Sequence, residues 1–273
     1  MIKLLSSDLN GTLVHQQTMS HMVRLYRSEI AASQDLSSLF EKKAEGNASA
    51  AEALAVTGPS TKGLTLRQAI DYTRTHMTFV DGFQEFVNTL YTNGIHLVIN
   101  STGYSVTIYA LREQVGKDKI HGHMENFLKF GEDADPNATL REDELESLVA
   151  RYFMPGYSDS PVYDKIKATG RIEVSIGDEA TKTRSLIEYA RRHFPDINPS
   201  QIAHIGDTIG DSECIHSIAR LGGLGIAFNY NPALEHFFKN KLALGEIPGR
   251  MVLVDPKNRF SNLMHVVPYL LNP

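Results

Sequence analysis

The sequence predicts an α/β protein with a doubly wound parallel sheet and helices packed against it. Short apolar runs of strand length alternate with longer segments in which apolar residues recur every three or four positions. Such alternation is typical of βαβ units, in which consecutive strands run parallel and helices cover them. The 273 residues suffice for one large domain or for a main domain with a smaller partner.

The expected strands are apolar runs that end at a glycine or a polar residue. They cover residues 2–5, 95–99, 202–205, 224–228 and 251–254. Helical periodicity or capping residues predict helices at 16–40, 65–76, 82–93, 104–115 and 183–192, and a further helix that begins at 139 or 141 and ends at 153. Residues 48–62 are expected to form a loosely packed helix followed by a loop. Residues 118–175 are longer than a short connection requires, and beyond one helix and several turns their pattern predicts no regular element.

Composition is that of an ordinary globular protein, with 42% apolar and 22% charged residues. The formal charge of -5 and the pI near 6.1 argue against a general nucleic-acid binder, which would carry a basic surplus. No apolar run is long enough to predict a transmembrane helix, and the first residues lack the features of a signal peptide. The single Cys214 cannot form an intrachain disulfide, so we expect a cytoplasmic protein.

Asp8 is the first of several chemically active side chains that stand at element ends. It directly follows the first expected strand, and Gly11 and Thr12 complete a turn after it. A carboxylate at the carboxyl end of a strand lies where open α/β sheets bind their ligands. By itself the segment fits a simple Asp-Gly turn equally well.

Two further segments suit a phosphate group. Ser101, Thr102 and Gly103 follow the strand at 95–99, where a hydroxyl and backbone N–H groups can meet a phosphate oxygen. Lys182 begins the helix at 183–192, and an ammonium there would offset the charge of an acidic nucleophile and of a phosphoryl group. Taken alone, these segments also fit a helix N-cap and a surface lysine.

Asp207 and Asp211 form the fourth feature, after the buried strand at 202–205. Two carboxylates four residues apart can face one hard cation, and Mg²⁺ prefers oxygen ligands in octahedral geometry. A helix N-cap followed by an acid in the first turn is the competing interpretation. The apolar strand that Gly206-Asp207 terminates favours the metal site.

In their order along the chain, the four segments resemble the four motifs of the haloacid dehalogenase (HAD) superfamily. The matching residues are Asp8-Leu-Asn-Gly-Thr12, Ser101, Lys182 and Gly206-Asp-Thr-Ile-Gly-Asp211. The resemblance covers about three-quarters of the chain. Val80-Asp-Gly82, Val98-Ile-Asn-Ser-Thr-Gly-Tyr104 and Gly225-Ile-Ala-Phe-Asn-Tyr-Asn-Pro-Ala233 further resemble the phosphoserine-phosphatase-like branch.

The resemblance implies a Mg²⁺-dependent phosphomonoesterase that acts on a small phosphorylated metabolite. Asp8 would attack phosphorus and form an aspartyl phosphate, which water then hydrolyses. The implied magnesium ligands are Asp8, Asn10 through its backbone carbonyl, Asp207 and Asp211. The implied catalytic residues are Asp8, Asn10, Ser101 and Lys182, and the implied phosphate-binding residues are Ser101, Thr102, Gly103 and Lys182.

The resemblance also implies a helical cap domain between the first two motifs. Residues 15–79 would form this cap, and residues 1–14 and 80–273 would form the core. The cap would close over the site and exclude water during phosphoryl transfer. Residues 118–175 would then be a small extension of the core or a second cap-like element.

Asn10 departs from the HAD pattern, because phosphatases of this kind have an aspartate there that protonates the leaving oxygen and then activates water. An amide cannot do either, and loss of a general acid typically costs ~10²–10⁴ in rate. The asparagine fits an enzyme with a good leaving group or another proton donor, or an engineered change that traps the phosphoenzyme. It also fits a phosphate-binding or regulatory relative with little turnover. Phosphoryl transfer to an acceptor other than water is a further alternative.

Overall fold

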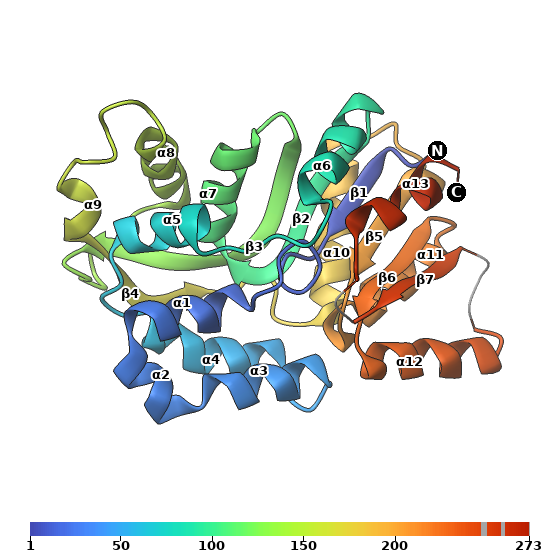
Figure 1. The fold of residues 1–273 in the computed structure, drawn as a ribbon, viewed down its shortest axis with the longest axis horizontal. Coiled ribbons are helices and arrows are strands. Elements are labelled where there is room, and N and C mark those ends of the chain that lie inside the picture. The colour runs from blue at the N-terminus through green and yellow to red at the C-terminus, as the bar shows by residue number, and fades with distance from the viewer. Residues whose placement is uncertain (247–249, 258–259, 273) are drawn as a thin grey trace.

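The computed structural model describes residues 1–246, 250–257 and 260–272, and its centre is a seven-stranded sheet (Figure 1). The strand order is β4-β3-β2-β1-β5-β6-β7. The strands are β1 (Leu4–Ser7), β2 (His96–Tyr104), β3 (Ile120–Glu132), β4 (Ile166–Glu173), β5 (Ile202–Gly206), β6 (Leu224–Tyr230) and β7 (Met251–Pro256). The predicted α/β fold class is confirmed. It needs one correction, because the edge strand β4 pairs antiparallel with β3.

Successive residues of the central strands point to opposite faces of the sheet, and different helices cover each face. On one face, Leu5 of β1 shares a core with Phe86. On the other face, Leu4 and Val98 pack with Leu186. The helices of the core are α6 (Phe83–Thr92), α7 (Ser105–Val115), α10 (Glu179–His193), α11 (Ser212–Arg220), α12 (Pro232–Ala243) and α13 (Val267–Leu271). Apolar strands buried on both sides explain why their sequences read as continuous apolar runs.

β1 lies at the point where the order of strands along the sheet changes direction. It pairs with β2 on one side and with β5 on the other. The chain adds β3 and β4 beyond β2, and it adds β6 and β7 beyond β5. In open α/β sheets, ligands bind beside the carboxyl ends of the strands at such a switch point. The carboxyl ends of β1, β2 and β5 are therefore the expected location of a site.

Residues between β1 and β2 form five further helices. They are α1 (Thr18–Tyr26), α2 (Ser28–Gln34), α3 (Leu36–Ala44), α4 (Ala50–Ser60) and α5 (Leu66–Thr75). The single helix expected over 16–40 was wrong, because the chain breaks at Arg27 and again at Asp35, which has a left-handed backbone. The helices α1–α4 lie together beside the sheet, whereas α5 packs against α7 (Figure 1). Their assignment to a separate cap domain stays a prediction.

The extension at 118–175 contains two strands that the sequence did not predict. β3 is 13 residues long, and polar residues interrupt its apolar ones, so no strand-length apolar run marks it. Pairing with β2 on one side and β4 on the other stabilises it. The helices α8 (Glu142–Tyr152) and α9 (Val162–Lys165) complete the extension. Helix α4 packs on β4, so this part of the sheet supports the inserted helices.

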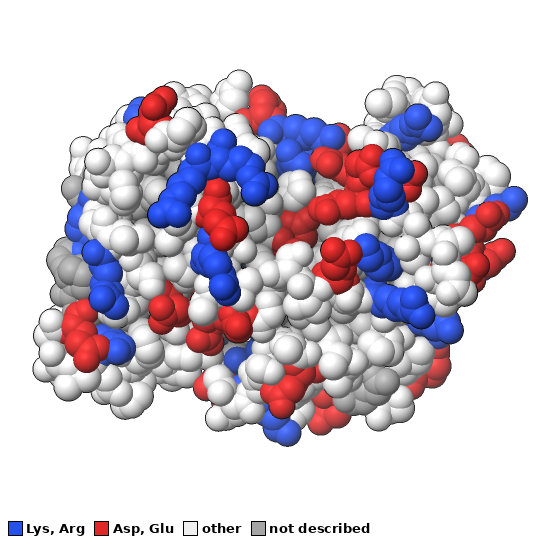
Figure 2. All heavy atoms as spheres, turned by 180° about the vertical axis from the view of Figure 1, so that it is seen from behind, with Lys and Arg blue, Asp and Glu red and all other residues white. Residues whose placement is uncertain are grey.

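Charge is mixed on the face shown in Figure 2, where Lys and Arg side chains are interspersed with Asp and Glu and neither sign forms one continuous field. This distribution agrees with a chain that has no basic surplus. Within the described ranges, no helix has both the length and the apolar character that crossing a membrane requires.

Close packing of α11 on β6 yields the first prediction. A Cβ added at Gly225 would lie 2.4 Å from the Ile215 carbonyl oxygen, which is backbone and cannot rotate away. We expect Gly225→Ala to lower the free energy of unfolding by about 1–3 kcal/mol, as overpacking does elsewhere. Urea unfolding measures the change. Gly177→Ala is the control, since its Cβ would meet nothing closer than 3.4 Å. Equal stability of the two variants would contradict the packing argument.

Candidate functional site

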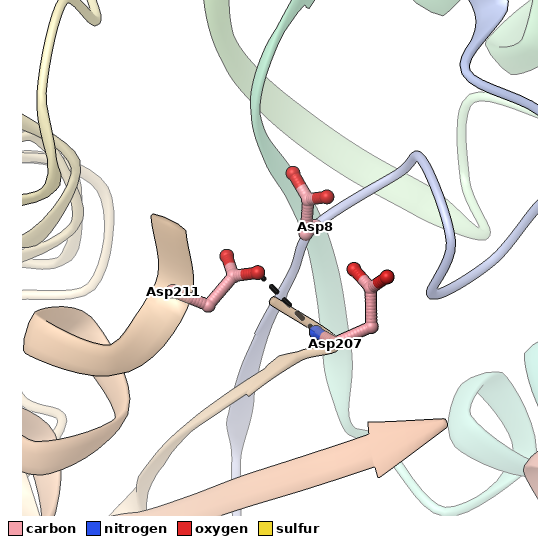
Figure 3. A group of neighbouring side chains, drawn as sticks. All are labelled: Asp8, Asp207 and Asp211. Carbon is pink, nitrogen blue, oxygen red and sulfur yellow. Dashed lines mark hydrogen bonds between the residues drawn. The ribbon is translucent and has the colours of Figure 1, made fainter. Parts of the chain in front are cut away.

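Three carboxylates converge at the switch point of the sheet. Asp8 follows β1 and Asp207 follows β5, while Asp211 ends the short helix η2 (Ile209–Asp211). All three residues are buried, and one carboxylate oxygen of each lies within 4.8 Å of those of the other two. Figure 3 shows the three side chains, carried by separate segments, around a shared space. In the described part of the chain, no other three acidic, histidine or cysteine side chains gather in this way.

The turn after Asp8 fits closely against Asp207. Gly11 has a left-handed backbone with φ +83°, and a Cβ at this position would lie 2.0 Å from Asp207 Oδ2. Any other residue would therefore clash with the carboxylate as well as strain the turn. Thr12 Oγ1 donates a hydrogen bond to Asp207 Oδ1 at 3.2 Å. The Asn229 amide donates to the Gly11 carbonyl at 2.6 Å and holds the turn from β6.

Lys182 neutralises part of this charge. Its Nζ lies 2.9 Å from Asp8 Oδ1 and 2.5 Å from Asp211 Oδ1, and its side chain is 3% exposed. Burial by itself would lower the pKa of Lys182, but the charges of Asp211 and Asp8 outweigh burial and hold the pKa above its ordinary value. The lysine is therefore a fixed positive charge between two carboxylates.

The other two carboxylates differ in their surroundings. Burial, together with the negative charges of Asp211 and Asp8, raises the pKa of Asp207 well above its ordinary value. For Asp211, burial is outweighed by Lys182 and His204, and the pKa falls. The His204 Nε2 atom lies 3.5 Å from Asp211 Oδ1. The ion pair with Lys182 thus stabilises Asp211, while Asp207 forms no ion pair with any residue that the structure describes.

The donor set fits a divalent cation. Asp207 Oδ2 is buried, and within the described residues it has no hydrogen-bond partner. A cation between Asp8, Asp207 and Asp211 would supply that partner and favour the charged form of Asp207. Carboxylate oxygens are the ligands that Mg²⁺ prefers. The cluster is consistent with a metal site.

A cavity of about 280 Å³ opens beside Asp8, Lys182 and Asp211. Helix α3 contributes Lys43 to its wall, and Lys43 Nζ donates a hydrogen bond to Thr102 Oγ1 at 3.0 Å. Removal from solvent lowers the pKa of Lys43, and the positive charge of Lys182 acts in the same direction, whereas the charge of Asp8 opposes it. The cavity therefore has a second lysine that comes from the inserted helices.

Of the remaining predicted site residues, Thr102 lines the cavity, whereas Asn10, Ser101 and Gly103 are not part of its wall. Ser101 is fully buried, and its Oγ accepts a hydrogen bond from the Gly103 backbone N–H at 3.2 Å. Asn10 is also buried, and its Oδ1 accepts from the backbone N–H of Thr18 at 2.9 Å, at the start of α1. The Asn10 side chain thus links the Asp8 turn to the inserted helices.

The chain is similar in sequence to a known phosphatase. No family model matches the chain. The phosphoserine phosphatase of Archaeoglobus fulgidus is 24% identical to it over 233 residues, which are 85% of this chain and 54% of that protein. The chain therefore spans about half the length of the curated relative that it matches.

Solved structures resemble the chain over nearly its whole length. A phosphoserine phosphatase with a phospho-aspartyl intermediate analogue has a TM-score of 0.67 at 18% identity, with 98% of this chain and 99% of that chain covered. A HAD family hydrolase of Salmonella enterica has a TM-score of 0.64 at 15% identity, with coverages of 98% and 70%. The chain has the haloacid dehalogenase fold. Its relatives in sequence and in structure are phosphoserine-phosphatase-like.

In this HAD fold, three residues of the site and of its supporting hydrogen-bond network were not predicted from the sequence. Lys43 lies in a helix whose pattern gave no sign of a site, and His204 sits inside a buried strand. Asn126 is in the unpredicted strand β3, where its amide donates to the carbonyls of Thr102 and Ile176 at 3.1 and 3.0 Å. None of them belongs to a short motif, so only the folded chain could reveal them.

Asn126 provides the second prediction. It is fully buried, and its Oδ1 also accepts from the backbone N–H groups of Ser175 and Ile176. Asn126→Asp would keep these two hydrogen bonds and lose the two that the amide donates. Each unsatisfied buried group costs about 1–3 kcal/mol. We expect urea unfolding to show a fall of this size in the free energy of unfolding of Asn126→Asp. The free energy of unfolding of the exposed control Asn88→Asp should stay within about 0.5 kcal/mol of that of the unchanged chain. A variant as stable as the control would show that the network contributes little.

Proposed function

We propose that the chain is a Mg²⁺-dependent phosphomonoesterase that acts on a small phosphorylated metabolite through an aspartyl phosphate on Asp8. The observation that carries the proposal is the contact of one buried lysine, Lys182, with both Asp8 and Asp211 beside a cavity. This arrangement combines a carboxylate nucleophile with a fixed positive charge for the phosphoryl oxygens. The phosphatase names of the relatives support the same chemistry.

In the proposed reaction, an Asp8 carboxylate oxygen attacks phosphorus, and the bond from phosphorus to the leaving oxygen breaks. Lys182, the Ser101 hydroxyl, Thr102 and the Gly103 backbone would bind the phosphoryl oxygens. Water then attacks phosphorus, which releases phosphate and regenerates the carboxylate. Asp8 is able to act as nucleophile because it lines the cavity, although it is largely buried.

Asp8, Asp207, Asp211 and the Asn10 backbone carbonyl would hold the magnesium ion. When bound, the ion supplies positive charge against the phosphoryl oxygens and helps to orient them. The missing partner of Asp207 Oδ2 supports this assignment.

Residues 15–79 are proposed to act as the cap of a core formed by residues 1–14 and 80–273. Support comes from the end of α3, which brings Lys43, Gly46 and Ala48 to the cavity wall. A cover at this position would exclude water from the phosphoryl group during its transfer to Asp8.

A second candidate function is phosphate binding or regulation with little turnover, and Asn10 favours it because an amide cannot act as a general acid. Against it, a lysine in contact with two carboxylates is more than passive phosphate binding requires. Transfer of the phosphoryl group to another acceptor would use the same Asp8 chemistry, and a phosphorylated acceptor product would distinguish it from hydrolysis.

The third prediction tests the nucleophile with p-nitrophenyl phosphate. We expect Mg²⁺-dependent hydrolysis that is abolished by EDTA and restored by added Mg²⁺. Asp8→Asn should lower kcat by at least about 10⁴-fold, because no covalent intermediate forms. Lys182→Ala should lower it by about 10²–10³-fold. The exposed Asp196→Asn is the control for the carboxylate change. Full activity of Asp8→Asn would overturn the assignment of the nucleophile.

The fourth prediction concerns Asn10→Asp. An aspartate can accept the same hydrogen bond from Thr18, and it adds a carboxyl group that can donate a proton. We expect kcat/KM for an alkyl phosphate such as glycerol 1-phosphate to rise by about 10-fold or more. The rise for p-nitrophenyl phosphate should be smaller, because nitrophenolate leaves without protonation. An unchanged rate for the alkyl phosphate would show that this position does not limit proton transfer.

A further inference from the structure

Lys43 is held in the cavity by contacts of the residues that follow it in the chain. The carbonyl of Ala44 accepts a hydrogen bond from the Asn231 side-chain amide at 2.7 Å. Gly46 lies against Ile209, because a Cβ added at Gly46 would be 3.2 Å from Ile209 Cγ2. These contacts seat the end of α3 on the loops that follow β5 and β6. The position of Lys43 is therefore fixed by the fold.

The surroundings of Lys43 are those of the reacting groups. Its Nζ donates a hydrogen bond to Thr102, the residue after Ser101. The charges of Asp8, Lys182, Asp211 and Asp207 all affect the pKa of Lys43. Lys182 already contacts Asp8 and Asp211, whereas Lys43 makes no ion pair within 4.0 Å among the described residues. Its N–H groups are donors that the carboxylate cluster does not use.

Asn10 is engaged elsewhere and has no proton to give. Its Oδ1 accepts from the Thr18 backbone N–H. An alkoxide leaving group nevertheless needs a proton when its bond to phosphorus breaks. Lys43 lies in the cavity wall and is a cation that can donate a proton. Lys182 is not available for this role, because it lies between two carboxylates.

We propose that Lys43 is the proton donor for the leaving group, in the role that Asn10 cannot fill. This inference rests on the proposed phosphatase function. An Asp8 oxygen bonds to phosphorus while the bond to the leaving oxygen breaks, and that oxygen keeps the electron pair. It takes a proton from Lys43 Nζ and departs as an alcohol, which leaves Lys43 as a neutral amine.

The second step returns the proton. The amine accepts a proton from the water whose oxygen attacks phosphorus, and the bond between phosphorus and Asp8 breaks. The products are phosphate, the Asp8 carboxylate and the Lys43 ammonium, so the cycle closes. The lowered pKa of Lys43 makes its ammonium a stronger acid than an ordinary lysine, which agrees with this use.

The test is the dependence of rate on the leaving group in Lys43→Met. Substrates are p-nitrophenyl phosphate, phenyl phosphate and glycerol 1-phosphate, which need increasing protonation of the leaving oxygen. We expect kcat/KM for glycerol 1-phosphate to fall about 10²–10⁴-fold. The fall for p-nitrophenyl phosphate should be at least about 10-fold smaller. Lys42→Met, an exposed lysine one position earlier in α3, is the matched control.

Two further variants distinguish proton donation by Lys43 from the effect of its positive charge. Lys43→Arg keeps the positive charge but gives up a proton far less readily, so it should stay slow with glycerol 1-phosphate. Asn10→Asp in the Lys43→Met background should restore activity toward this substrate. Thermal melting of each variant checks that it is folded.

The outcomes distinguish the role of Lys43 from the phosphatase function on which it rests. Equal losses for all three substrates in Lys43→Met, or full rescue by arginine, would mean that Lys43 only binds anionic substrate, and would overturn the inference while the phosphatase function stands. Absence of Mg²⁺-dependent p-nitrophenyl phosphate hydrolysis in the unchanged chain would overturn the phosphatase function and the inference together.

Discussion

The contact of Lys182 with Asp8 and Asp211 is the constraint on which the site depends. Three carboxylates within 4.8 Å of one another repel, and burial makes each charge more expensive. One buried ammonium offsets part of that repulsion, and it fixes the relative positions of α10, β1 and the loop before α11. Burial and the charges of Asp211 and Asp8 raise the pKa of Asp207, and a divalent cation beside it would favour its charged form.

The inserted helices contribute residues to the cavity wall. Lys43 and the Ala44 carbonyl meet the core through Thr102 and Asn231. Asn10 makes another link between these helices and the Asp8 turn, since its side chain accepts a hydrogen bond from the first residue of α1. Movement of these helices would therefore change the surroundings of Asp8 directly. The extension β3–β4 adds support, because α4 packs on β4.

Asn10 makes a structural contact but lacks a carboxyl group that could act as a general acid. Its oxygen satisfies a backbone donor at the start of α1, a hydrogen bond that an aspartate would also accept. Its amide cannot act as a general acid. The structure thus explains how Asn10 is accommodated at the start of α1.

The sequence by itself determined the α/β class and the positions of most core strands, because strands buried on both faces appear as apolar runs. It also indicated Asp8, Ser101, Lys182, Asp207 and Asp211, since short motifs at element ends carry them. It could not indicate β3, whose apolar residues are interrupted by polar ones and whose stability comes from neighbouring strands. Nor could it place Lys43, Asn126 or His204, because their surroundings are made by segments distant in the chain. Only the tertiary structure decided that a lysine from helix α3 lines the same cavity as Asp8, since that arrangement depends on packing between elements that share no local pattern.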